Sequence, residues 1–341
     1  MNFIRNFGWY AVKRTLMVIP LLFGVSLVAF FIIRLGDVNP AVLVAGPTAS
    51  AAEIAKVSEQ LGLDLPLIQQ YWTYLNNAVS GDLGRSWITG RPVSAELRIR
   101  LPVTIELITI GTIASVIVGL FLGFVAGMRE RSLVDHVLRV STLGGISMPI
   151  FWLGLLLIYV LFFLVGWAPP PLGRQSLMLS APTFRTGFPL LDAILDGNGE
   201  VVVSMLRHLM LPVITMALVI GATIAKQTRA SVIEVRHTPM VRYARAIGMP
   251  QWRIWWLVLH NSLPSVITFI AIAYSLQLGG SVLIELIFSW GGIGQLGVNA
   301  IQRADYAVVQ AYVFAMGVLA AAIYLIADLV IASIDPRVTY K

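Results

Sequence analysis

Six long apolar segments constrain the fold of this chain more than any other feature of its sequence. A helix needs about 20 mostly apolar residues to cross the hydrocarbon core of a bilayer. Six stretches reach this length: residues 12–34, 103–128, 141–166, 207–228, 265–287 and 309–333. Because unpaired backbone groups are costly in lipid, such stretches are expected to form helices. The sequence therefore predicts an all-α integral membrane protein with six transmembrane helices in a lipid bilayer.

The composition agrees with this prediction and excludes several kinds of function. Only 12% of the residues are charged, against about 25% in soluble domains. The absence of cysteine excludes disulfides, thiol catalysis and cysteine metal ligands. The formal charge of +7 is what cytoplasmic loops of membrane proteins carry, so we expect no nucleic-acid partner. No metal site is expected either, because the four histidines lie far apart in the sequence: His136, His208, His237 and His260.

The cations alternate between the loops and predict an orientation. Lys and Arg gather at the amino terminus, in the second and fourth loops and at the carboxyl end. The third and fifth loops hold only Arg174, Arg185 and Arg303, and the cations of the long first loop are offset by acids. Since cytoplasmic loops carry the excess of Lys and Arg, both termini and the fourth loop are expected to be cytoplasmic.

The fourth loop contains a basic, turn-punctuated stretch, residues 238–264, which we call the knob. Thr238 is suited to cap a helix that has Pro239 at its first position. Gly248 is suited to end that helix, and Pro250 to start a second short one. Two short helices that meet at a glycine form a protrusion. A membrane protein with such a protrusion is expected to have a soluble partner that receives it.

The helical spacing also assigns faces to the first knob helix. Four residues are predicted to share one face, and Arg242 and Arg245 to lie on another. The four residues of the shared face are Met240, Tyr243, Ala244 and Ile247.

The first loop is the largest extracytoplasmic piece. Ser50 and Glu53 form a capping box for a helix that ends at Gly62, and Pro66 starts another. The second of these helices carries an aromatic cluster of Tyr71, Trp72 and Tyr74. Aromatic side chains outside the membrane need a packing partner. Two interpretations remain open: the cluster packs on the chain's own spans or at the headgroup level, or it contacts a docked protein.

These boundaries divide the chain into three parts. Residues 1–35 comprise the cytoplasmic amino terminus and the first span, and residues 36–102 form a small helical cap on the outer side. Residues 103–341 form a five-span core that contains the cytoplasmic loop 229–264.

Three ionisable residues lie inside or near the ends of spans, where charges are rare and often mark a transport path. Glu106 and Glu285 lie near outer ends, and Asp328 near an inner end. The first interpretation is a translocation or gating role, above all for Glu285 and Asp328. The second interpretation places the two glutamates at the interface with water and pairs Asp328 with a cation such as Lys226 or Arg229.

Other motifs give no catalytic site. The sequence GATIAKQT at 221–228 resembles a phosphate-binding loop but has Ala225 where the glycine before Lys226 is required. We therefore expect no catalytic residues and no cofactor in this chain. A self-sufficient carrier or channel stays open as an alternative, although carriers more often show a mid-span carboxylate and inverted repeats. Glycines at 119, 123 and 127 predict a close helix contact, either for packing or for a helix that slides during gating.

Eight segments together make the chain resemble the type I ABC-importer permeases of the dipeptide/oligopeptide/nickel group, in the subgroup of the first of two paired permeases. They are GDLGRSWITGRPV (81–93), RLPVTIEL (100–107), SMPIFWLGLLLIY (147–159), RHLMLPVITMAL (207–218), YARAIG (243–248), IELIFSWGGIG (284–294), RADYAVVQ (303–310) and DPR (335–337).

The resemblance implies the type I importer permease fold and a location in the bacterial cytoplasmic membrane. It implies three kinds of partner: a second homologous permease, two ATP-binding subunits that hold ATP and Mg²⁺, and an extracytoplasmic binding protein that meets the outer loops. The transported solutes would be mainly di- and oligopeptides, with nickel chelates, opines and oligosaccharides as variants. The knob would be the coupling helix, with contacts from Arg242, Tyr243, Ala244, Arg245, Gly248 and Met249.

The knob departs from the family's pattern in two ways. Arg242 stands where the generic motif has a glutamate, and Leu263 and Pro264 come three residues later than the generic spacing. A particular ion pair of the generic motif is therefore not carried over to this chain.

Overall fold

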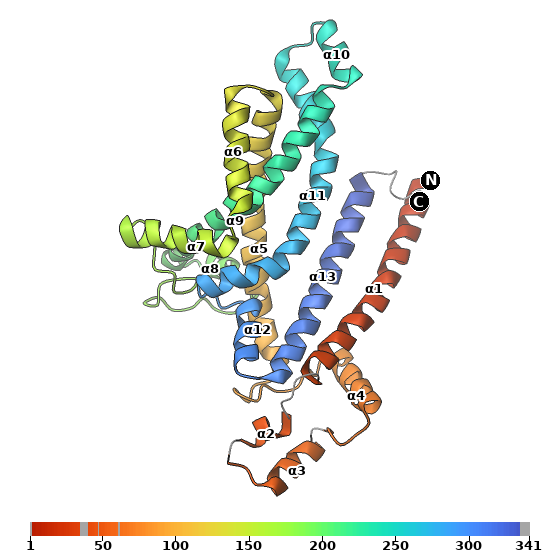
Figure 1. Cartoon of the computed structure of the whole chain (residues 1–341), viewed down its shortest axis with the longest axis vertical. Coiled ribbons are helices and arrows are strands. Elements are labelled where there is room, and N and C mark those ends of the chain that lie inside the picture. The colour runs from red at the N-terminus through yellow and green to blue at the C-terminus, as the bar shows by residue number, and fades with distance from the viewer. Residues whose placement is uncertain (1, 35–39, 47, 61, 335–341) are drawn as a thin grey trace.

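The computed structural model describes residues 2–34, 40–46, 48–60 and 62–334, and its regular elements are helices (Figure 1). In chain order they are α1 (Asn2–Arg34), α2 (Pro40–Ala45), α3 (Ala51–Gln60), α4 (Leu67–Val79), α5 (Val93–Met128), α6 (Leu133–Ser147), α7 (Ile150–Leu157), the π-helix η1 (Ile158–Leu164), α8 (Pro189–Leu195), α9 (Gly199–Arg236), α10 (Pro239–Ala246), α11 (Gln251–Ile287), α12 (Ile293–Gln302) and α13 (Tyr306–Ile334). The predicted all-α fold is confirmed.

Five of the six predicted spans are single helices long enough to cross a membrane: α1, α5, α9, α11 and α13. The predicted span at 141–166 is not a single straight helix. That region consists of α6 and of α7 with η1, which meet at an angle of 102°. The cause is Pro149, because the residue before a proline is driven out of the helical region, and Met148 is extended, with φ −85° and ψ 126°. The chain has six spans when this bent pair counts as one.

The long helices run beside one another along the molecule (Figure 1). The knob helix α10 lies at one end of the long axis, and α2, α3 and α4 lie toward the other end. The start of α1 and the end of α13 lie toward the α10 end, whereas α7 crosses the direction of the long helices. The predicted helical cap of the first loop is therefore present, at the opposite end from the knob.

The most extensive contact between helices joins α5 and α9, and it runs along the three glycines spaced by four. A side chain at Gly119 would meet Ile224 and the Gly221 carbonyl oxygen. At Gly123 it would lie 2.5 Å from the Ala225 carbonyl oxygen, and at Gly127 it would meet Val232. Small residues let two helix backbones approach in a membrane, so the predicted close contact is confirmed.

The first loop is tied to the last span by one aspartate. Asp305, just before α13, accepts hydrogen bonds from the Ser86 hydroxyl and from the Trp87 backbone N–H, the latter at 3.3 Å. The Trp87 ring packs edge-on against Tyr306. Two of the family-like segments, 81–93 and 303–310, thus meet in space. The segment DPR at 335–337 lies outside the described residues.

The capping signals of the first loop are also confirmed. The Ser50 backbone N–H donates to the Glu53 carboxylate at 2.7 Å, and the Glu53 N–H donates to the Ser50 hydroxyl at 3.3 Å. The α-helix ends at Gln60, two residues before the predicted Gly62, which has φ +64°. Pro66 is the N-cap of α4, as its position predicted.

Gly123→Val should destabilise the folded chain by about 1–3 kcal/mol, the usual cost of overpacking a tight contact. Thermal unfolding of the purified protein in detergent measures this loss. Gly144→Val is the matched control, because a Cβ atom at Gly144 meets nothing within 4 Å. Equal unfolding temperatures for the two variants would contradict the α5–α9 packing described above.

Candidate functional site

The knob begins where α9 leaves the bundle. Thr238 is the N-cap of α10 and Pro239 its first residue, as predicted. The Thr238 hydroxyl does not cap the helix, however; it donates back to the Val235 carbonyl at 2.7 Å. The hydroxyl therefore fastens the turn between α9 and α10 rather than the start of α10.

The end of α10 is a complete Schellman motif. The Gly248 N–H donates to the Arg245 carbonyl at 3.0 Å, and the Met249 N–H donates to the Ala244 carbonyl at 3.0 Å. Gly248 has φ +75°, the left-handed conformation that this motif needs and that glycine adopts without strain. The prediction that Gly248 ends the helix is confirmed.

The second knob helix is not short. After Pro250, α11 continues for 37 residues from Gln251 to Ile287 and becomes the fifth span. Pro264 lies inside this helix without ending it, which transmembrane helices tolerate. The prediction of two short helices is wrong in this respect, and the consequence is mechanical: any movement of the knob acts directly on a transmembrane helix.

One face of α10 is buried against the ends of three long helices. Val241 and Ala244 are buried, and Val241 packs in a cluster with Val232, Ile254 and Val258. Met249 packs at the edge of the same cluster. The knob is therefore a packed structure rather than a loose loop.

A second face of α10, next to the buried one, is apolar and exposed. Met240, Tyr243 and Ile247 point outward, with Tyr243 68% exposed, and Arg242 and Arg245 flank them. The predicted shared face is thus wrong for Ala244, which lies one position from the outward stripe and packs inward with Val241. An exposed apolar patch with a basic rim is typical of a protein-binding surface.

An ion pair and a hydrogen bond hold the base of the knob, and neither was predicted from the sequence. Asp135 of α6 accepts two hydrogen bonds from the Arg229 guanidinium of α9, at 2.6 and 2.9 Å. Glu130 accepts from the His237 ring at 2.8 Å, and this bond holds the Glu130 pKa below its ordinary value. Ser132 followed by Asp135 is a helix-start signal that could have indicated the ion pair.

The structure also corrects the interpretation of the acidic residues in the spans. Asp328 forms the expected type of ion pair, but with Arg14 of α1, at 3.0 Å, rather than with Lys226 or Arg229. Arg14 is available because α1 and α13 pack side by side. The Glu106 carboxylate accepts the Leu190 backbone N–H at 3.1 Å and so holds the start of α8.

Glu285 is not at the interface with water; its side chain is fully buried. Its carboxylate accepts hydrogen bonds from the Thr104 hydroxyl and from the Gln295 backbone N–H at 2.9 Å. Thr104 in turn accepts the Ile293 N–H at 2.9 Å. A carboxylate at this place stabilises the first turn of α12, so Glu285 orients α12 against α5 and α11.

The aromatic cluster of the outer cap divides into two parts. Tyr71 is buried, and its hydroxyl is 2.7 Å from the Ser26 hydroxyl of α1. Tyr74 packs against Phe30 and Phe314. These two residues hold the cap on the chain's own spans, whereas Trp72 is 58% exposed.

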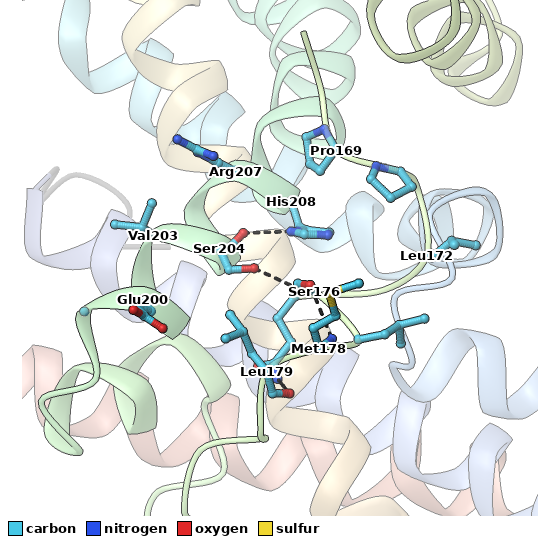
Figure 2. A pocket seen from close by; sticks show the side chains of 14 residues that line it. Pro169, Leu172, Ser176, Met178, Leu179, Glu200, Val203, Ser204, Arg207 and His208 are labelled. Atoms are coloured by element: carbon cyan, nitrogen blue, oxygen red, sulfur yellow. Dashed lines mark hydrogen bonds between the residues drawn. The ribbon is translucent and has the colours of Figure 1, made fainter. Parts of the chain in front are cut away.

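An open cavity of about 900 Å³ lies at the other end of α9 from the knob (Figure 2). The third loop and the first turns of α9 form its walls. The Ser176 N–H donates to the Ser204 hydroxyl at 2.9 Å, and the His208 Nδ1–H donates to the Ser204 carbonyl at 2.8 Å. Its polar lining includes Gln175, Glu200, Arg207 and His208. The cavity makes the end of the molecule opposite the knob hollow beside the third loop.

The fold and the knob define a multi-spanning membrane protein with a packed, protruding loop. Comparison with known proteins identifies the family. Residues 119–340 match the family described as binding-protein-dependent transport system inner membrane component. Residues 9–108 match the amino-terminal region described for the same kind of component. The chain therefore belongs to the binding-protein-dependent transport system inner membrane components.

Its relatives align over almost their whole length. The probable D,D-dipeptide transport system permease protein DdpB of Escherichia coli is 39% identical over 92% of this chain and 93% of that protein. The dipeptide transport system permease protein DppB of Alkalihalophilus pseudofirmus is 36% identical over 97% and 99%. The glutathione transport system permease protein GsiC of Escherichia coli is 34% identical over 97% and 99%.

Tyr71→Ala should lower the stability of the folded chain by about 3 kcal/mol, because it removes a buried aromatic side chain. Trp72→Ala should stay within about 0.5 kcal/mol of the parent, as exposed positions do. Thermal unfolding in detergent compares the two neighbours directly. If Trp72→Ala proved the more damaging, the division of the cluster into a buried and an exposed part would be wrong.

Proposed function

We propose that this chain is one of two permease subunits of an ATP-driven, binding-protein-dependent importer. The observation that carries the proposal is the knob: an exposed apolar face on a rigid helix, joined directly to two membrane-spanning helices. The basic rim suits an acidic partner surface. ATP-driven closure of the two ATP-binding subunits would move the knob and, through α9 and α11, change the access of the transport path.

The chain itself hydrolyses no ATP in this proposal; ATP and Mg²⁺ bind to two partner subunits. The exposed Arg242, Tyr243 and Arg245 would contact the partner. Ala244 and Met249 would hold α10 from inside, and Gly248 would set the angle between α10 and α11. Glu285 and Asp328 would influence gating only through the helices that they position.

The transported solute is proposed to be a di- or oligopeptide. The names of the relatives support this, because they denote dipeptide and glutathione transport systems. The path would form between this chain and a second, homologous permease. An extracytoplasmic binding protein would deliver the peptide to the outer face, where the first cap, including the exposed Trp72, and the hollowed third loop are available for contact.

A self-sufficient carrier or channel is the alternative. It would need no docking surface, and the outward Tyr243 face would then have no explanation. The two hypotheses differ in whether ATP-binding subunits remain with the purified chain and whether peptide uptake into vesicles requires ATP.

Gly248→Val should uncouple ATP hydrolysis from peptide uptake. Valine at φ +75° is strained by about 1 kcal/mol or more, and no neighbour lies within 4 Å, so the effect comes from the backbone. The altered angle between α10 and α11 should lower uptake at least severalfold while ATP hydrolysis continues. Uptake and hydrolysis are measured together in vesicles that contain the assembled complex.

Gly197→Val is the control, since Gly197 has φ +68°, also has no neighbour within 4 Å, and lies just before α9 at its outer end. It carries the same backbone penalty away from the knob and should keep uptake coupled. Full uptake by assembled Gly248→Val would refute the coupling role. Absence of ATP-dependent peptide uptake by the parent complex would refute the proposed function itself.

We also propose that the chain lies in the cytoplasmic membrane with both termini in the cytoplasm. A reporter fused after Lys341 should then signal the cytoplasm, and one inserted near Ser180 in the third loop should signal the outer side. The physical reason is the excess of cations on the knob side. The opposite signal at either position would overturn the proposed topology.

A further inference from the structure

Three cationic side chains meet near the knob end of α5, α6 and α9, which pack together there (Figure 1). Arg139 of α6 and Lys226 and Arg229 of α9 line one small cavity. Gly123 of α5 and Thr142 of α6 complete its wall. This cluster plays no part in the docking face of α10.

The charges of the cluster do not balance. Arg229 is neutralised by its two hydrogen bonds to Asp135. In the described part of the chain, neither Arg139 nor Lys226 has a carboxylate within 4.0 Å. Arg139 instead donates to the His136 Nδ1 at 2.8 Å. Three cations and one carboxylate leave a local charge of +2, which favours an anion.

The cluster lies at headgroup depth. Arg139 comes two residues before the apolar stretch 141–166, and Lys226 and Arg229 flank the end of the stretch 207–228. The neighbouring surface is apolar: Leu122 and Leu138 line the cavity, and Leu143, one helical turn beyond Arg139 toward the middle of the span, is exposed. Cations above an apolar surface match the shape of a phospholipid rather than that of a small soluble anion.

The cavity itself is small, at about 10 Å³. This is roughly the space of a single water-sized atom, so one oxygen of a phosphate group fits, while the remaining oxygens stay at the mouth. There the exposed Arg139 and Lys226 side chains supply charged donors, the strongest partners for phosphate. Basic pockets between transmembrane helices on the cytoplasmic side are known to bind acidic headgroups.

We propose that this cluster is a binding site for the phosphate headgroup of an anionic phospholipid of the cytoplasmic leaflet. The bound lipid joins α6 to α9 beside the Asp135–Arg229 pair and lays its acyl chains along Leu122, Leu138 and Leu143. The site thereby strengthens the same helix contact that supports the base of the knob.

The test measures lipid retention and does not depend on transport. The full chain, purified with its partner subunits, is placed in nanodiscs of phosphatidylcholine with phosphatidylglycerol. Bound lipid is then counted by native mass spectrometry after release. The double variant Arg139→Gln/Lys226→Gln should retain phosphatidylglycerol about 30-fold more weakly, from about 1 kcal/mol per cation. Each single variant should lose about fivefold, which keeps the test decisive if the double variant does not assemble.

The control variant is Lys13→Gln/Arg131→Gln, which removes the same charge from exposed positions that do not line the cavity. It should keep the tightly held lipid. Equal loss in both double variants would overturn the proposal in favour of general attraction to cations. No preference for phosphatidylglycerol over phosphatidylcholine would overturn it as well. The last comparison uses nanodiscs of phosphatidylcholine alone. Inorganic phosphate that binds the parent complex there as tightly as phosphatidylglycerol does would overturn the lipid assignment in favour of the free anion.

Discussion

The close contact between α5 and α9 is the constraint on which the rest of the molecule depends. Lipid is as apolar as a leucine side chain, so helices in a bilayer gain little by hiding apolar surface and associate through tight packing. Gly119, Gly123 and Gly127 allow the two backbones to touch. Onto this pair pack α6, α7, α8 and α11. Because α9 continues directly into the turn before α10, the position of the knob is fixed by the same contact.

A few polar contacts then set the relative positions of the other helices. Asp135 joins α6 to α9 near the knob, and Glu285 with Thr104 joins α11 to α5 and α12 near the other end. Such contacts are strong where water is excluded, and an unpaired partner would be costly there. A push on α10 therefore reaches α11 without a flexible joint other than Gly248. This arrangement suits a permease that converts movement of a soluble subunit into movement of spans.

Much of this could be predicted from the sequence, because apolar length, capping residues and glycine spacing act locally. The spans, the capping box at Ser50 and the role of Gly248 belong to this group. The remainder depends on contacts between distant parts of the chain. Nothing near Asp328 in the sequence indicates Arg14, and the burial of Ala244 reflects the cluster that receives Val241. Pro149 itself indicates a break in the helix. It lies within an apolar stretch that is long enough for one span, so the stretch is interpreted as a single span.

The central claim is that the outward face of α10 contacts an ATP-binding subunit. The chain has no cysteine, so a single Tyr243→Cys variant carries one thiol for a photoreactive crosslinker. We expect a crosslinked product with the mass of this chain plus one ATP-binding subunit, with a yield that changes when ATP is added. Leu177→Cys, on the exposed third loop, should give no such product. An active complex in which Tyr243→Cys crosslinks no better than Leu177→Cys would contradict the account.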